Sequence, residues 1–243
     1  MRRICLSVMK IHKKWIFITD MFDFNENDIR LINMEKALNI LHIREKIPED
    51  IFTSLELNAL LEGYQNKGAK IASMLHRREI IPLRRGLYTF TDVLRKQPLS
   101  NGVMANRIYG PSYVSEDFAL CYHGLIPETP YVVTSMTMGR SREFTNDFGA
   151  FSYRYCRSKA YSIGVVLAGG EHRHFLIASP FKALYDKALN DSRWDGEDPE
   201  PYLEDDLRID LEALQREDKQ TLHELAPFMT GRLKKLHHFL EEL

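Results

Sequence analysis

Basic side chains are concentrated in one short stretch of the sequence. Between Tyr64 and Phe90 six cations oppose Glu79 alone, so this stretch has a net charge of +5. Clustered cations attract nucleic-acid phosphates, and polar or guanidinium side chains on a helix can read base edges in the major groove. A solvated basic face that contacts another protein is the alternative. The residues predicted to bind double-stranded DNA are Asn66, Lys67, Lys70, Ser73, His76, Arg77, Arg84 and Arg85.

Two other patterns have the spacing of catalytic or metal sites. His172 and His174 fall on the same side of a predicted strand, but no third or fourth ligand follows at a recognisable spacing. A metal-dependent hydrolase or nuclease would need this pair, and exposed strand histidines are the simpler interpretation. Ser179 and Lys182 have the spacing of a serine acyl enzyme, without its companion motifs. We therefore predict no enzyme activity, no metal and no cofactor.

The basic residues fall within a predicted run of three helices and a hairpin. A helix begins at Met34, and Thr53 to Glu56 has the pattern of a capping box that begins a second helix. Asn66 is a good N-cap for a third helix, which ends near Arg78 and packs through Ile71, Met74, Leu75 and the stem of Arg78. Strands at residues 80–83 and 87–90 then flank an Arg84-Arg85-Gly86 turn. This order predicts a winged-helix domain over residues 34–98.

Residues 99–243 are predicted to form a second domain, which makes the whole chain α+β. Helices are expected at residues 103–109, after Ser115, and after Ser179-Pro180, where Pro takes the first helical position. Four segments rich in β-branched and aromatic residues, at 131–138, 150–156, 161–168 and 172–178, predict a mostly antiparallel sheet. An acidic, partly looped stretch at 191–218 has a net charge of −9, and the terminal helices break at Pro227.

The remaining features of the sequence limit its class. The 243 residues are 44% apolar and 28% charged with a net charge of −1, which excludes a uniformly basic coat for nucleic acid. The three cysteines are widely spaced, as in proteins of a reducing cytoplasm. Residues 1–33 have no sustained helical or strand period, so we expect an extension outside the fold, and Met34 is the alternative to Met1 as the start of translation. We expect no membrane partner, because lysines interrupt the first apolar run.

Several short motifs give the chain a resemblance to a known family. They are Arg85-Gly86-Leu87-Tyr88, Pro111-Ser112-Tyr113-Val114-Ser115 with Ala119-Leu120, His123-Gly124-Leu125-Ile126-Pro127, and Lys182-Ala183-Leu184 with Asp186. With them the chain resembles the AbiEi-type antitoxins of bacterial abortive-infection, type IV toxin–antitoxin systems. The resemblance covers roughly residues 34–243.

The resemblance implies a function as well as a fold. A winged helix would bind operator DNA and repress the protein's own operon, and an antitoxin domain at residues 99–243 would counteract a nucleotidyltransferase-type toxin in phage defence. It assigns toxin neutralisation to no side chain and does not require direct contact with the toxin. The alternative is a stand-alone winged-helix regulator whose second domain senses a partner or ligand.

Overall fold

The computed structural model describes residues 9–11, 14–16, 40–156, 159–170 and 173–243, and the chain divides into two compact units, Met1–Lys46 and Ile47–Leu243. In the first unit β1 (Met9–Ile11) pairs antiparallel with β2 (Lys14–Ile16), where the sequence predicted no regular element. The rest of the predicted N-terminal extension lies outside the described residues.

The predicted first helix is described only in its second half. Residues 40–46 are helical, and residues 34–39 lie outside the described part of the chain. Ile40 and Ile43 are buried, whereas Leu41 is 46% exposed. The helical spacing of Met34, Ala37, Leu38 and Leu41 predicts an apolar face that includes Leu41. For Leu41 this prediction is wrong, because the buried positions of the described part are Ile40 and Ile43.

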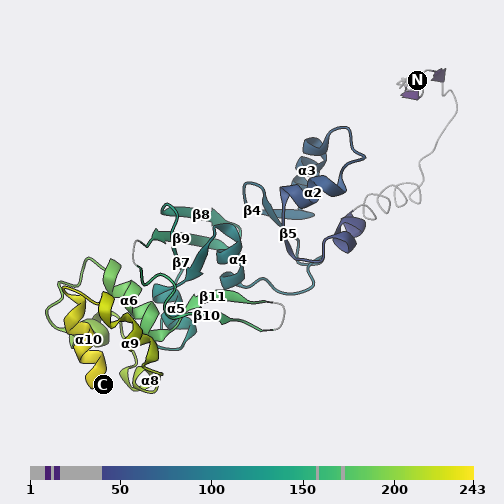
Figure 1. The fold of residues 1–243 in the computed structure, drawn as a ribbon. Helices are drawn as coiled ribbons and strands as arrows, with labels where there is room; N and C mark the ends of the chain where they lie inside the picture. Colours follow the sequence, from purple (N-terminus) through teal and green to yellow (C-terminus); the bar gives the residue numbers. More distant parts are fainter. Residues whose placement is uncertain (1–8, 12–13, 17–39, 157–158, 171–172) are drawn as a thin grey trace, which may run out of the picture. The chain divides into compact units, whose positions relative to one another are not determined.

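The second unit begins with a small antiparallel sheet and two helices (Figure 1). Its strands β3 (Ile51–Thr53), β5 (Leu87–Phe90) and β4 (Ile80–Arg84) lie in that order. Helices α2 (Ser54–Leu60) and α3 (Lys67–His76) connect β3 to β4. The element order from residue 40 is thus helix, strand, two helices and a two-stranded hairpin.

Local signals in the sequence begin both helices of this sheet. The Thr53 hydroxyl accepts a hydrogen bond from the Glu56 amide at 3.3 Å, and the Thr53 amide donates to the Glu56 carboxylate at 2.7 Å. These two bonds confirm the predicted capping box. The Asn66 side chain accepts from the Ala69 amide at 2.9 Å, which confirms it as the N-cap of α3.

The larger sheet has six strands in the order β10-β11-β6-β7-β9-β8. Three neighbouring pairs are antiparallel, but β11 runs parallel to β6 and β7 parallel to β9, so the sheet is mixed. The sequence did not predict β6 or β8. The strands are β6 (Ser112–Val114), β7 (Val132–Thr137), β8 (Arg142–Asn146), β9 (Gly149–Tyr155), β10 (Val165–Ala168) and β11 (Phe175–Ala178).

Helices pack around this sheet, and the last of them lie at the end of the unit opposite α2 and α3 (Figure 1). The break at Pro227 is confirmed, since a short 3-10 helix (Ala226–Phe228) separates α9 from α10. None of the described helices is long and apolar enough to cross a membrane. The helices are α4 (Asn101–Ile108), α5 (Glu116–Tyr122), α6 (Pro180–Asn190), α7 (Pro199–Pro201), a π-helix (Tyr202–Asp206), α8 (Leu211–Gln215), α9 (Gln220–Leu225) and α10 (Leu233–Glu242).

Polar residues inside α6 hold the centre of the larger domain together. Lys182 and Asp186 are both fully buried, with 3.0 Å between Lys182 Nζ and Asp186 Oδ1. The hydroxyls of Tyr113 and Ser115 donate to Asp186 Oδ2 at 2.9 and 2.8 Å. Ser115 occupies the N-cap position of α5, but its hydroxyl makes no capping bond, because Asp186 accepts it instead. The buried carboxylate therefore ties β6 to α6.

The two predicted domains share one core. Ile51, Leu83 and Leu87 of the small sheet belong to the same buried cluster as Met104 and Ala105 of α4. Residues 98 and 99, where the sequence analysis placed the domain boundary, lie inside the second compact unit. The separate folding of residues 34–98 stays a prediction.

Candidate nucleic-acid interface

Helix α3 presents a narrow solvent face made of small and polar residues. Met74 is buried, whereas Ala69, Ala72 and His76 are exposed and Ser73 is half-buried beside them. At about 100° per residue, these last four side chains fall in one sector of the helix. The ten residues of α3 make a rod of about 15 Å, long enough to lie along a major groove.

The two alanines are the part of this face that the sequence analysis missed. Ala69 and Ala72 are exposed, although small apolar residues are common inside a core. An alanine on a recognition helix lets the backbone approach the base pairs closely, and its methyl group can contact the methyl of thymine. The sequence does contain a signal for this face, because a helical projection places Ala69, Ala72 and His76 on the same side of α3.

The predicted polar residues of α3 flank this face on one side. Arg77 donates to the Ser73 hydroxyl at 2.7 Å and lies 3.3 Å from the Glu79 carboxylate. The ammonium group of Lys70 lies 5.2 Å from the centre of the Tyr64 ring, a cation–π contact. Asn66 is exposed at the N-terminus, where its side-chain oxygen is used for capping.

Lys67 and Arg78 are placed differently from the other cations of this stretch. Lys67 is half-buried and donates to the Asn58 carbonyl at 3.1 Å, so it points toward the end of α2. Arg78 was predicted to pack with Met74, but its side chain is 74% exposed and lies 2.5 Å from Asp147. Its backbone has a φ of 53°, which ends the helical spacing before Arg78 and explains why that prediction is wrong.

The hairpin of β4 and β5 carries the two predicted arginines at its turn. Arg84 and Arg85 are exposed, and Gly86 has a φ of +78°, which a glycine adopts without strain. The Gly86 carbonyl accepts from the Ser54 amide at 2.9 Å. The turn is therefore fixed to the first residue of α2.

A neighbouring strand adds cations to this turn. Asn146 of β8 donates its side-chain amide to the Leu83 carbonyl at 3.0 Å. Burial raises the pKa of Tyr153, and the positive charge of Arg84 opposes this shift. In the sheet register Tyr153 stands opposite Arg142, which is exposed. The arginine turn and β8 therefore lie side by side, and this edge carries exposed arginines together with the exposed Glu143.

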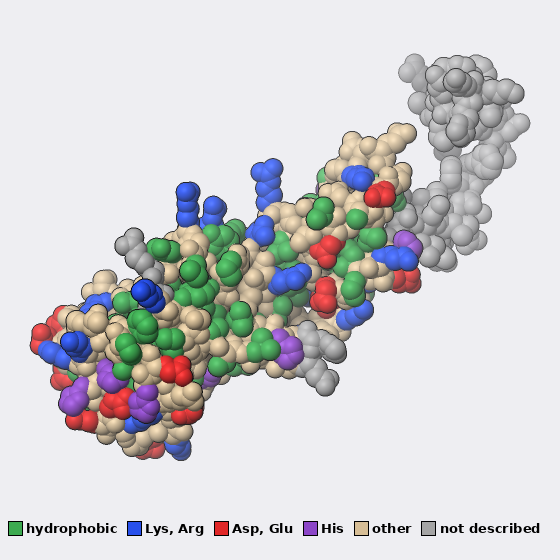
Figure 2. All heavy atoms as spheres, viewed as in Figure 1, with side chains coloured by type: hydrophobic (Ala, Val, Ile, Leu, Met, Phe, Trp, Pro, Cys, Tyr) green, Lys and Arg blue, Asp and Glu red, His purple; other side chains and the backbone are tan. Residues whose placement is uncertain are grey.

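Figure 2 shows Lys and Arg side chains projecting along this edge, over β8 and the β4–β5 hairpin. We define the basic edge as four exposed residues, Arg84, Arg85, Arg140 and Arg142. Arg140 and Arg142 were not predicted from the sequence, because about 55 residues separate them from the turn and only the fold brings β8 beside the hairpin.

The acidic stretch lies in the second half of the unit, on the π-helix and the short helices around it. Most of its carboxylates are exposed, including Glu204, Asp205 and Asp206 of the π-helix. Glu217 is half-buried, and Asp191 is buried and lies 2.6 Å from Arg193. The local charge is thus separated between α3 with the basic edge and this acidic stretch.

The histidine pair is described only in part. His174 is exposed, and His172 lies outside the described residues. Among the residues that the structure describes, no three His, Cys, Asp or Glu side chains are grouped so as to hold a metal ion. Lys182 and Ser179 also have different partners, since Lys182 donates to the Ala160 carbonyl at 3.0 Å and Ser179 donates to Thr221 at 3.4 Å.

Comparisons with known proteins give no family assignment. No protein-family model matches the chain, and no curated protein matches it.

Proposed function

We propose that this protein is a winged-helix regulator that binds double-stranded operator DNA. The observation that carries the proposal is the exposed face of α3 beside the arginine turn of β4 and β5, in a helix–strand–helix–helix–strand–strand order. A helix of this width enters the major groove, and a hairpin turn beside it contacts the sugar–phosphate backbone.

In this proposal the side chains of α3 and the adjoining Arg77 contact the bases. Ser73, His76 and Arg77 reach base edges, while Ala69 and Ala72 let the helix approach the groove floor. In the free protein Arg77 contacts Ser73 and Glu79. Arg77 must exchange these partners for DNA, so part of its binding energy is offset by the lost contacts.

The basic edge supplies the contacts that do not depend on sequence. Arg84 and Arg85 bind phosphates next to the groove that α3 enters, and Arg140 and Arg142 extend the contact along the backbone. Each phosphate neutralised in this way releases condensed counterions, which makes the affinity strongly dependent on salt.

The resemblance to AbiEi-type antitoxins supports a more specific role for such a regulator. In that role the protein represses its own operon and counteracts a nucleotidyltransferase-type toxin in phage defence, in the cytoplasm. Residues 99–243 perform the neutralisation, and their acidic stretch is unsuited to DNA because like charges repel. A stand-alone regulator whose second half senses a ligand is the alternative.

Fluorescence anisotropy with DNA from the protein's own promoter tests the binding proposal. Arg77→Ala should weaken binding and reduce the preference for promoter DNA over scrambled DNA, because base contacts carry about 1–3 kcal/mol of discrimination each. Arg85→Ala should weaken binding to both DNAs equally. Lys234→Ala is the matched control, since Lys234 is an exposed lysine on α10. Binding by Arg77→Ala and Arg85→Ala equal to wild type would refute the interface.

The antitoxin role is tested in cells with the full-length chain. Cutting at residue 98 would expose Ile51, Leu83 and Leu87, which share a core with α4, so point variants are the better tool. Co-expression with a nucleotidyltransferase encoded beside this gene should show rescue by wild type. The Arg77→Ala, Arg85→Ala double variant should rescue equally well while losing repression. Absence of a neighbouring toxin gene, or loss of rescue in the double variant, contradicts this division.

A further inference from the structure

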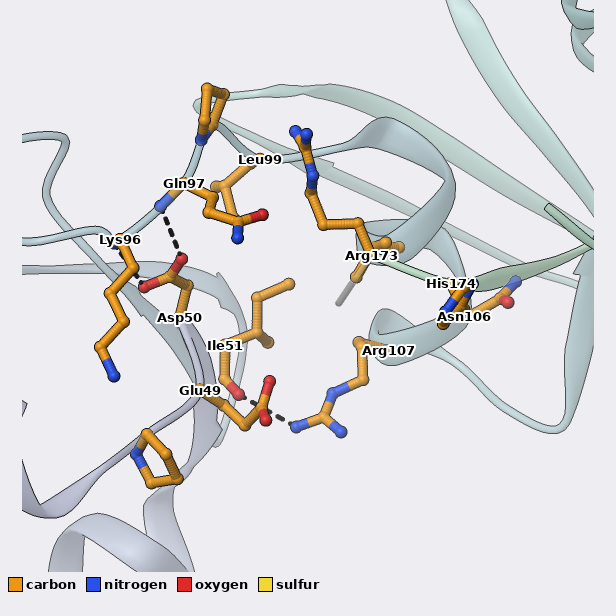
Figure 3. A pocket seen from close by; sticks show the side chains of 13 residues that line it. Glu49, Asp50, Ile51, Lys96, Gln97, Leu99, Asn106, Arg107, Arg173 and His174 are labelled. Atoms are coloured by element: carbon orange, nitrogen blue, oxygen red, sulfur yellow. Dashed lines mark hydrogen bonds between the residues drawn. The ribbon is translucent and has the colours of Figure 1, made fainter. Parts of the chain in front are cut away.

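A cavity of about 440 Å³ lies beside the small sheet, within the second compact unit. Its wall combines the segment that leads into β3, the connection before α4, α4 itself and the segment that leads into β11 (Figure 3). The volume falls in the range of about 300–1,000 Å³ that small-molecule sites occupy. The lining therefore joins β3 of the small sheet to α4 and to the segment before β11 of the larger sheet.

Positive charge surrounds this cavity more densely than negative charge. Lys96, Arg107 and Arg173 line it, against the carboxylates of Glu49 and Asp50. Both oxygens of Asp50 accept backbone hydrogen bonds, from the Lys96 amide at 3.0 Å and the Gln97 amide at 3.2 Å. Arg107 donates to the Ile51 carbonyl at 3.0 Å. Arg173 and Lys96 are exposed and point to opposite sides of the cavity (Figure 3), so an anion can reach Arg173 without breaking a buried contact.

One polar atom in the wall is buried without a partner. Among the described residues, the side-chain oxygen of Gln97 makes no hydrogen bond although it is shielded from solvent. Figure 3 shows the Gln97 side chain reaching into the cavity beside Leu99. A buried acceptor without a donor costs about 1–3 kcal/mol, and a ligand that supplies an N–H or O–H removes this cost.

The apolar part of the wall suits a flat organic body. Ile51, Leu99 and Val103 line the cavity together with two prolines. A ligand that uses every part of this wall carries an anionic group, a flat apolar surface and a hydrogen-bond donor. Nucleoside monophosphates combine a phosphate, a flat base and an amino or imino donor on that base.

We propose that this cavity binds a nucleoside 5′-monophosphate, with the phosphate at Arg173 and a base donor at Gln97. Resting on the proposed function, we further assign the ligand a regulatory role. An occupant touches Ile51 of β3 and Val103 of α4 at once, so it alters how the small sheet and α4 pack. Because α2 and α3 stand on that sheet, occupancy changes the affinity for operator DNA.

Isothermal titration of the full-length chain, without DNA, tests the binding. Adenosine, guanosine, cytidine and uridine monophosphates are the probes, with the matching nucleosides and inorganic phosphate as comparisons. At least one monophosphate should bind about tenfold or more tightly than its nucleoside and than phosphate, because both ends of the wall are used. No saturable binding of any monophosphate at millimolar concentration would overturn the proposal, and so would equal binding of phosphate alone.

Two variants locate the ligand. Arg173→Ala and Gln97→Ala should each weaken the monophosphate about tenfold. Neither side chain makes a hydrogen bond that holds the fold together among the described residues, so both variants should melt like wild type. Arg216→Ala, an exposed arginine outside the cavity lining, is the charge-matched control and should bind like wild type. Unchanged affinity in both cavity variants places the ligand elsewhere and overturns the site.

A separate measurement tests the regulation. Saturating monophosphate should change the operator affinity of wild type about fivefold or more, and Arg173→Ala should lose this response at the same nucleotide concentration. Nucleotide binding without any change in DNA affinity overturns the regulatory step and leaves the binding site standing. If the protein does not bind DNA, the proposed function is refuted. The titration without DNA still shows whether the cavity binds a nucleoside monophosphate.

Discussion

Glu116 is a buried carboxylate whose ionisation should make the folded chain less stable at high pH. It is 2% exposed, has a φ of 51°, and accepts a hydrogen bond from the Asn190 amide at 3.1 Å. Burial is the largest influence and raises the pKa of Glu116 from 4.5 to about 7, although Arg154 and Lys187 oppose the shift. The folded state thus holds this proton more tightly than the unfolded state does.

The sign and size of the effect follow from this difference. Because the folded-state pKa of Glu116 is the higher one, stability falls as the pH rises from about 4.5 through about 7. At about 1.4 kcal/mol per pKa unit, ionised Glu116 costs the folded state about 3 kcal/mol at about pH 8 and about 1 kcal/mol at about pH 5.5. Glu116→Gln keeps the acceptor for Asn190 and cannot ionise. The difference in free energy of unfolding between Glu116→Gln and wild type should therefore be about 2 kcal/mol larger, in favour of the variant, at about pH 8 than at about pH 5.5.

Urea unfolding of both chains at the two pH values measures this gain. Glu143→Gln is the control, since Glu143 is an exposed residue of β8 and its substitution should give a difference near zero. The same difference between Glu116→Gln and wild type at both pH values would refute the reasoning. It would mean that Arg154 and Lys187 fully compensate the burial of the carboxylate.

Two further stability predictions use the same assay. Asp186→Ala should lower the free energy of unfolding by about 3–5 kcal/mol, because it leaves Lys182 as an unpaired buried charge. Tyr113→Phe should lower it by about 1.5–3 kcal/mol, because it removes one hydrogen bond to the same carboxylate. Small and equal losses in the two variants would show that this hydrogen-bond network does not stabilise the fold. Gly164→Ala should cost about 2 kcal/mol or more, since Gly164 has a φ of +66° and an added Cβ would lie 2.4 Å from Thr221; a melting temperature unchanged from wild type would contradict this.

The sequence predicted the elements whose signals are local. The capping box at Thr53, the N-cap at Asn66, the Pro180 start of α6 and the hairpin around Gly86 each depend on a few adjacent residues. The pairing of strands depends on residues that are far apart in the sequence. β6 has three residues, all buried, and it becomes a strand because β11 and β7 pair with it on its two sides.

The candidate DNA interface was likewise predictable only where its residues are close together in the sequence. Polar residues along α3 are visible in the helical spacing, so Ser73 and His76 of its exposed face were predicted, whereas Ala69 and Ala72 carried no charge to mark them. Arg140 and Arg142 join the arginine turn only through the fold, as β8 is an exposed strand with a polar sequence that lacks alternation. The cavity lined by Gln97 and Arg173 forms between segments that are far apart in the sequence, so no local pattern indicates it.

The salt dependence of operator affinity tests the central claim most directly. Wild type and the Arg84→Ala, Arg85→Ala double variant are titrated with promoter DNA over a series of salt concentrations, with Lys234→Ala as control. Each lost phosphate contact lowers the slope of log affinity against log salt by about 0.9, so the double variant should have a slope about 1.8 smaller in magnitude than wild type. An unchanged slope, or a control that falls equally, would show that the arginine turn does not contact DNA.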